Sequence, residues 1–148
     1  MRAARVVDNL IVKTGALRAY VIWIPMLDKD EGAEVPHVSK NVNASPQYFD
    51  GSMLIGNALS RASGITETVW DTFLFYPAGT KWGPDGLPFP DKVIAQQGGV
   101  VVGTSATLPP VADQSRLLPS LRGRMKVIGE QSNFESILTQ VATLFARQ

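Results

Sequence analysis

The chain has 148 residues, about the length of one domain, and its 45% hydrophobic and 18% charged residues predict a folded, globular protein. Fourteen Lys and Arg against thirteen Asp and Glu leave a net charge of +1, which argues against the strongly basic surface that nucleic-acid binding requires. The absence of cysteine and the presence of a single histidine, His37, exclude thiol catalysis, disulfides, thiolate metal sites and a histidine-rich metal centre within one chain.

The first 45 residues predict a helix, a strand and two polar stretches. Apolar residues at helical spacing predict a helix over 3–14 that ends at Thr14-Gly15. A nearly continuous apolar run at 17–27, rich in β-branched and aromatic residues, predicts a strand buried on both faces, as is typical of a central parallel strand. The acidic stretch 28–34 is interpreted as a loop or a frayed helical turn. The polar stretch 35–45 is ambiguous, with a short strand near Val38 as one reading.

The middle of the chain predicts one helix and two strands. Asp50 is placed to cap a helix over 51–63. A second apolar strand is expected at 68–76. A further strand is expected over 93–102, in which Gly98-Gly99 indicates a bulge or a bend.

Two segments are predicted to be irregular, a Pro- and Gly-dense loop at 80–91 and a longer stretch at 104–131. A last helix is predicted after this stretch, because Ser132 and Glu135 have the spacing of a capping box, which marks the start of a helix. Its apolar residues form one face and comprise Phe134, Ile137, Leu138, Val141, Leu144 and Phe145. We expect this face to pack on a sheet.

Strands that alternate with helices favour an α/β fold with a central sheet and helices on both of its faces. The two apolar strands, 17–27 and 68–76, are expected to lie side by side and parallel, joined by the helix over 51–63. We therefore expect a single domain over residues 1–148 that contains the irregular stretch 104–131.

Three segments carry a resemblance to a known family. They are Val21-Ile22-Trp23-Ile24-Pro25-Met26-Leu27 with acidic residues after it, Tyr48-Phe49-Asp50 before a helix, and Val69-Trp70-Asp71 leading to Tyr76-Pro77-Ala78-Gly79 and Trp82. Together, within about residues 15–82, they resemble a set of bacterial thioredoxin-like proteins whose activity is not established. The resemblance implies a thioredoxin-like three-layer sandwich. The stretch that corresponds to the redox pair of thioredoxins contains Met26 and no thiol, so the implied domain is redox-inactive.

The candidate binding site follows from where ligands bind in open α/β sheets, which is beyond the carboxyl ends of the parallel strands. Here those ends are Pro25–Asp30 and Pro77–Trp82, which we expect to share one rim. The candidate binding residues are Trp23, Pro25, Met26, Asp28, Asp30, Asp50, Asp71 and Trp82. Tyr48, Phe49 and Tyr76 belong to a wider set of aromatic residues that could line a pocket, whereas Trp23 and Trp70 are interpreted as core. Aromatic rings beside carboxylates suit a cationic or amide-bearing partner.

An alternative hypothesis is a hydrolytic enzyme that uses Asp28, Asp50 and Asp71, with or without a metal ion. It predicts that these carboxylates converge in one pocket and that at least one has a raised pKa. For Asp71 by itself, a carboxylate bonded to backbone amides or an arginine at the mouth of the strand is the preferred interpretation.

Two charged clusters are interpreted as surface features. Asp28, Asp30, Glu31 and His37 lack the spacing of a calcium loop, which favours a solvated acidic loop over a metal site. Arg116, Arg122, Arg124 and Lys126 have no stacking aromatic among them, which favours a polar flap or a partner-binding loop over nucleic-acid binding.

The sequence therefore predicts a redox-inactive binding or interaction module with no catalytic residue, no cofactor and no metal. We expect a protein or small-molecule partner rather than nucleic acid. Whether the chain forms a homodimer is left open. Asp8, Asn9 and Lys13 interrupt the apolar residues near the N-terminus, so we expect neither a signal peptide nor a membrane-spanning segment, and the compartment is left unassigned.

Overall fold

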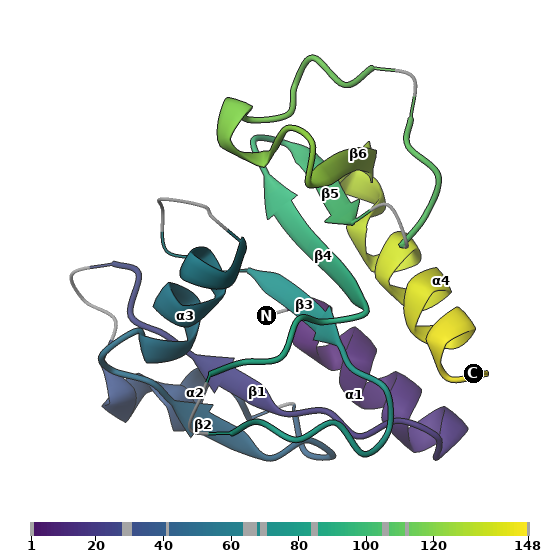
Figure 1. Ribbon diagram of the computed structural model, residues 1–148. Coiled ribbons are helices and arrows are strands. Elements are labelled where there is room, and N and C mark those ends of the chain that lie inside the picture. Colours follow the sequence, from purple (N-terminus) through teal and green to yellow (C-terminus); the bar gives the residue numbers. More distant parts are fainter. Residues whose placement is uncertain are drawn as a thin grey trace. The chain divides into compact units, whose positions relative to one another are not determined.

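The computed structural model describes residues 2–27, 31–40, 42–63, 68, 71–83, 86–104, 107–111 and 113–147. The chain forms two compact units, unit 1 (Met1–Leu54 and Glu135–Gln148) and unit 2 (Ile55–Phe134). The helices are α1 (Arg2–Thr14), α2 (Val35–Val38), α3 (Leu54–Ser63) and α4 (Phe134–Phe145), with short 3-10 turns at Gly32–Glu34, Pro119–Leu121 and Gln131–Asn133 (Figure 1). The strands are β1 (Val21–Trp23), β2 (Gln47–Phe49), β3 (Thr72–Phe75), β4 (Lys92–Gln97), β5 (Val100–Thr104) and β6 (Met125–Glu130).

Unit 1 begins with α1, and the helix predicted over 3–14 is confirmed. It ends where expected, because Gly15 adopts a positive φ of 63° and its N–H donates to the carbonyl of Ile11 at 2.9 Å. The buried carboxylate of Asp8 ties this helix to the segment before β2. It accepts hydrogen bonds from the backbone N–H groups of Asn43 and Ala44 and from the Ser45 hydroxyl, at 2.9 to 3.0 Å.

The sheet of unit 1 is a parallel pair of β1 and β2, in which Val21, Ile22 and Trp23 lie opposite Gln47, Tyr48 and Phe49. The prediction of a parallel strand within 17–27 is confirmed, but its expected full burial is wrong, because all three residues of β1 are half-buried. The stretch near Val38 is helical in α2 rather than a short strand, and Pro36 favours this because proline is tolerated in the first turn of a helix.

The sheet of unit 2 is an antiparallel meander in the order β3-β4-β5-β6. The strand expected over 93–102 is a hairpin instead: β4 ends at Gln97, and Gly98 and Gly99 form its turn. These two glycines have φ values of 54° and 81°, the left-handed conformation that a two-residue hairpin turn requires at both central positions.

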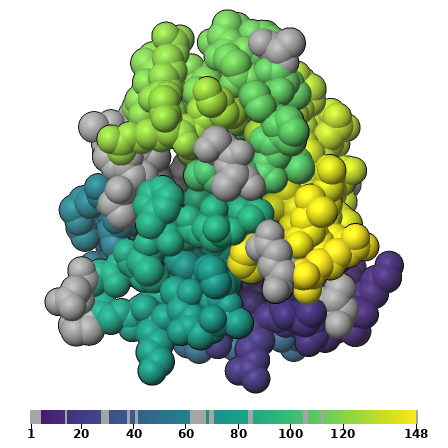
Figure 2. Space-filling view, turned by 45° about the vertical axis from the view of Figure 1, so that its right-hand side comes forward, coloured from purple at the N-terminus to yellow at the C-terminus, as the bar shows by residue number. Residues whose placement is uncertain are grey.

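The core of unit 2 is centred on β5, where Val100, Val101 and Val102 are fully buried. Residues Val100 and Val102 cluster with Leu117, Leu121, Met125 and Val127. The described residues of the stretch 104–131 are therefore not irregular throughout, because they include β6 and a 3-10 turn and contribute apolar side chains to this core. Their atoms, in green and yellow-green, lie together at the top of the view in Figure 2.

Two further helices differ in detail from expectation. Helix α3 begins at Leu54, four residues beyond Asp50, and is otherwise the helix predicted over 51–63. Helix α4 begins at Phe134 after a 3-10 turn that contains Ser132, so the expected capping box at Ser132 does not mark its first turn. The predicted apolar face is confirmed by the burial of Phe134, Ile137, Leu138 and Val141, whereas Leu144 is 44% exposed.

The architecture is mixed α/β, with one parallel pair, one four-stranded antiparallel sheet and four α-helices among the described residues. The expected parallel pairing of strands 17–27 and 68–76 is wrong: β1 pairs with β2, and β3 pairs antiparallel with β4. In the part of the chain that the structure describes, no helix is both long and apolar enough to span a bilayer.

Candidate functional site

The carboxyl end of the β1–β2 pair brings together several of the residues predicted to bind a ligand. The N–H of Asp50, the residue after β2, donates to the carbonyl of Trp23 at 2.8 Å. Pro25 and Met26 follow β1 and are half-buried, as is Asp50. Trp23, Pro25, Met26 and Asp50 are therefore gathered at one end of a parallel sheet, although the partner strand is β2 rather than the predicted one.

The two faces of this sheet carry different aromatic side chains. Opposite residues of a parallel pair share a face, and neighbours along a strand alternate. Trp23 and Phe49 therefore share one face with Gln47, whose Oε1 accepts a 3.0 Å hydrogen bond from the Trp23 indole N–H. Tyr48 is on the other face, where its ring centroid lies 6.4 Å from that of Tyr20.

The ring of Phe49 lies against two glycines, both of which approach its Cδ1 and Cε1 atoms. A Cβ on Gly32 would come within 2.9 Å of Phe49 Cδ1, and one on Gly51 would come within 3.0 Å of Cε1. Neither glycine has a positive φ, so close approach of the ring, and not backbone conformation, accounts for them. The Phe49 residue nevertheless remains 41% exposed, which is unusual for a strand phenylalanine.

Two exposed acidic residues belong to the segment that contacts this ring. Glu31 directly precedes Gly32, and Glu34 ends the 3-10 turn that begins at Gly32. We call the ring of Phe49 with Gly32, Gly51, Glu31 and Glu34 the Phe49 surface. An exposed aromatic ring beside an acidic segment attracts cations, through the ring quadrupole and through charge.

Two other predicted site residues, Asp71 and Trp82, belong to unit 2. Asp71 precedes β3 with a left-handed φ of 50°, and its Oδ2 accepts a 2.6 Å hydrogen bond from Gln96 Nε2. Loss of solvation raises the pKa of Asp71 above its usual value, and the hydrogen bond from Gln96 opposes this rise. The carboxylate is hydrogen-bonded at the mouth of the strand, as expected, but its partner is the Gln96 side chain rather than the expected backbone amides or arginine.

Trp82 is 45% exposed, and its ring stacks edge-on against Tyr76 with centroids 5.7 Å apart. The hydroxyl of Tyr76 is buried and has no hydrogen-bond partner among the described residues. Burial raises the pKa of Tyr76, so this phenol stays protonated in the neutral pH range. Trp82 is thus a surface aromatic held by one ring contact.

The acidic residues Asp28 and Asp30 lie outside the described residues, so their place at a rim shared with Trp82 stays a prediction. His37 is exposed on α2. Within the described ranges, no three His, Cys, Asp or Glu side chains form a group that could hold a metal ion. The convergence of Asp28, Asp50 and Asp71 likewise stays a prediction.

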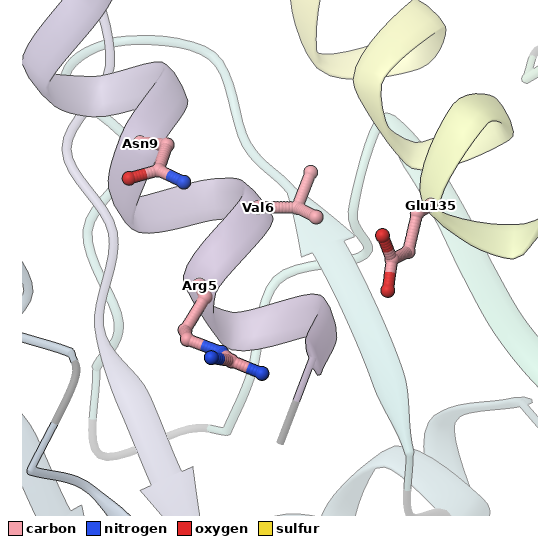
Figure 3. Close-up of a pocket in the computed structure, with 4 residues that line it drawn as sticks. All are labelled: Arg5, Val6, Asn9 and Glu135. Atoms are coloured by element: carbon pink, nitrogen blue, oxygen red, sulfur yellow. The ribbon is translucent and has the colours of Figure 1, made fainter.

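A second surface feature of unit 1 is an open pocket of about 300 Å³ between α1 and α4, lined by Arg5, Val6, Asn9 and Glu135. Figure 3 shows Val6 and Glu135 pointing into the space between the two helices. The lining offers one apolar side chain, one neutral amide and two side chains of opposite charge. Such an open, mixed lining lacks the enclosed apolar walls of a typical small-molecule site.

Phe49 is the functional candidate that sequence reasoning passed over, since it was placed only in a wider aromatic set. The available signal was Gly51 two residues after it. The second glycine of the cradle, Gly32, is 17 positions away in sequence, and only the fold shows that it lies against the ring.

Comparison with protein-family models, with curated proteins and with solved structures found no match to this chain. The candidate site is therefore argued from its own geometry.

Proposed function

We propose that the chain is a redox-inactive binding module and that the Phe49 surface takes a cationic side chain of its partner. The observation that carries this proposal is the exposed Phe49 ring, which is held in place by close approach to Gly32 and Gly51. A fixed ring loses little side-chain entropy when a partner stacks on it, and Glu31 and Glu34 supply the opposite charge.

The experiment is an NMR titration of the ¹⁵N-labelled chain with acetyl-arginine methylamide. We expect the largest amide shift changes at residues 31–34 and 49–51. Acetyl-glutamate methylamide, which has the opposite charge and similar size, serves as the control probe and should leave these amides unchanged.

Two variants of β2 make the assignment specific. Phe49→Ala should abolish the shift changes, whereas Tyr48→Ala, which removes an exposed ring from the opposite face, should retain them. Equal responses from both variants, or equal responses to both probes, would overturn the proposal.

The relationship to thioredoxin-like proteins is a separate part of the proposal. It rests on the residue pattern in 21–27 and 69–82 and on the lack of any cysteine that a redox role would need. The separate sheets of β1 and β3 in this structure argue against the three-layer sandwich. A crystal structure in which the segments 17–27 and 68–76 are neighbours in one sheet would restore it, and a crystal structure that keeps them in separate sheets would refute it.

A second candidate function, carboxylate-based hydrolysis by Asp28, Asp50 and Asp71, is favoured by one observation, the raised pKa of Asp71. It predicts hydrolysis of p-nitrophenyl acetate or p-nitrophenyl phosphate, with and without Mg²⁺, that Asp71→Asn abolishes. If the wild-type chain and Asp71→Asn hydrolyse both esters at the same rate as buffer, this candidate fails and the binding proposal is unaffected.

A further inference from the structure

The outer edge of β2 carries backbone groups that have no hydrogen-bond partner in the part of the chain that the structure describes. The carbonyl of Pro46 accepts from Val21 N–H at 2.9 Å, and the N–H of Asp50 donates to Trp23, so these two residues face β1. Backbone groups of a strand point to its two edges in alternation. The N–H and C=O groups of Gln47 and Phe49 therefore point to the edge opposite β1, where no described residue pairs with them.

An unpaired strand edge is a template for the addition of another strand. Here the edge is short and lies next to the Phe49 surface. A strand added beside β2 would place every second side chain on the face that carries Trp23 and Phe49. One of these side chains would lie opposite Phe49, whose ring contacts Gly32 in the turn that carries Glu31 and Glu34.

We infer that β2 binds an extended peptide by strand addition, with a Lys or Arg side chain of that peptide lying over the Phe49 ring. This inference rests on the proposed function and names its partner as a basic extended segment of another polypeptide. The backbone groups of Gln47 and Phe49 supply affinity, and the Phe49 surface supplies the preference for a cation.

The β2 edge could pair with a basic peptide or with β2 of a second copy of this chain, and the charges of Glu31 and Glu34 favour the peptide. Pairing of β2 with β2 of another copy would bring a second copy of the turn that carries Glu31 and Glu34 close to the first. Like charges brought together across paired strands are destabilising, whereas a basic side chain is attracted. The occupant that fits is therefore a basic peptide.

The test uses the heptapeptide acetyl-Thr-Val-Thr-Lys-Thr-Val-Thr-amide as the probe, with affinity measured by fluorescence anisotropy. A matched peptide with Glu at the centre should bind at least about tenfold more weakly. Two further peptides are N-methylated on alternate amides. In the first peptide the methyl groups block the amides that point to one edge of the extended chain, and in the second they block the amides that point to the other edge. One of them should lose about tenfold in affinity, and the other, whose methyl groups face away from β2, should bind like the parent.

Protein variants complete the test. Phe49→Ala and the double change Glu31→Gln with Glu34→Gln should each weaken binding of the Lys peptide, and Tyr48→Ala on the opposite face should not. Equal affinity of both N-methylated peptides and the parent would overturn the inference. If β2 pairs with a second copy, sedimentation will show a dimer that the peptide does not dissociate, which also overturns it. If either of these outcomes is found but acetyl-arginine methylamide still shifts the amides of residues 31–34 and 49–51, the proposed function stands and only the inference of strand addition fails.

Discussion

Gln114 occupies the position of a neighbouring strand beside Val127. Its side-chain Nε2 donates to the Val127 carbonyl at 3.1 Å, and its Oε1 accepts from the Val127 N–H at 2.8 Å. The N–H of Val111 donates to the same carbonyl at 2.9 Å. Because β6 is the last strand of its sheet, one side-chain amide and one backbone amide satisfy groups that an edge would otherwise expose.

Removal of this side chain should destabilise unit 2 and expose the edge of β6. Gln114→Ala leaves the Val127 N–H without its partner, which typically costs about 1–3 kcal/mol of unfolding free energy. Urea denaturation measures this cost, and sedimentation measures the accompanying self-association. Gln140→Ala, at an exposed position of α4, is the control. Identical urea midpoints for the two variants would show that the Gln114 amide does not hold the edge.

Local patterns predicted the elements of this fold better than their pairing. Helix α1 and the apolar face of α4 follow from helical periodicity over a dozen residues, which needs no knowledge of neighbours. The partner of β1 is β2, a strand of only three residues with Tyr48 and Phe49 exposed. So short a strand leaves no alternation to detect, and the longer apolar run at 68–76 was the natural but incorrect choice.

In the candidate site too, the features that depend on local sequence were predicted and those that depend on tertiary contacts were not. The position of Pro25 and Met26 at the end of a parallel strand follows from the strand itself and was predicted. The Phe49 surface depends on Gly32 approaching a ring from a different segment, which is a tertiary contact. The hairpin turn at Gly98-Gly99 was predicted as a bulge or a bend, because a glycine pair alone does not distinguish these from a strand reversal.

Phe134 should be a main contributor to stability. It is 5% exposed, and its ring centroid lies 5.6 Å from that of Phe73 in the same unit. Phe134→Ala should lower the unfolding free energy by about 3–5 kcal/mol, since a buried ring is lost and a cavity remains. Thermal unfolding measures the change. Leu144→Ala, at a position 44% exposed, is the matched control and should unfold near the wild-type Tm. A shift under one degree for Phe134→Ala, roughly a tenth of what this loss implies, would contradict the prediction.

Gly103 should tolerate no side chain. A Cβ at this position of β5 would lie 2.9 Å from the Val93 carbonyl oxygen and 2.9 Å from Ile128 Cδ1. The carbonyl is backbone and cannot move aside cheaply, so Gly103→Ala should destabilise by about 1–3 kcal/mol. Gly83→Ala, where an added Cβ meets nothing within 4 Å and φ is not positive, is the control. Equal stability of the two variants in urea would show that β5 shifts to make room.

The two described tryptophans should differ in their effect on stability. Trp23 is half-buried in β1 and donates its indole N–H to Gln47, whereas Trp82 is 45% exposed and contacts the ring of Tyr76. Trp82→Ala should cost about 0.5–1.5 kcal/mol, the usual value of an aromatic pair, and Trp23→Ala should cost more. Thermal melts of both variants compare them. If Trp82→Ala unfolds at the lower temperature, Trp82 belongs to the core and the hypothesis of an exposed aromatic anchor is wrong.

Asp8 should make the stability of unit 1 depend on pH. Burial by itself would raise the pKa of Asp8, but hydrogen bonds from Asn43, Ala44 and Ser45 outweigh burial and hold this pKa below its ordinary value. A carboxylate whose pKa is lower in the folded state stabilises the fold above its unfolded pKa, and that contribution is lost as pH falls through the folded pKa. The stabilisation is therefore complete above about pH 5 and declines below about pH 4.

Asp8→Asn tests this linkage. At pH 7 the variant should be less stable by about 1–3 kcal/mol, because an amide cannot accept all three hydrogen bonds as well as a carboxylate does. The difference from wild type should narrow as the pH falls below about 4, because the Asp8 carboxyl of the unfolded chain takes up a proton before the folded carboxylate does. Urea denaturation at pH 7, 5, 4 and 3 measures the difference, and Glu135→Gln, which changes an exposed carboxylate in the first turn of α4, is the control. A difference that stays constant across this range would show that the charge of Asp8 adds nothing to the anchoring of α1, and that the hydrogen bonds act independently of ionisation.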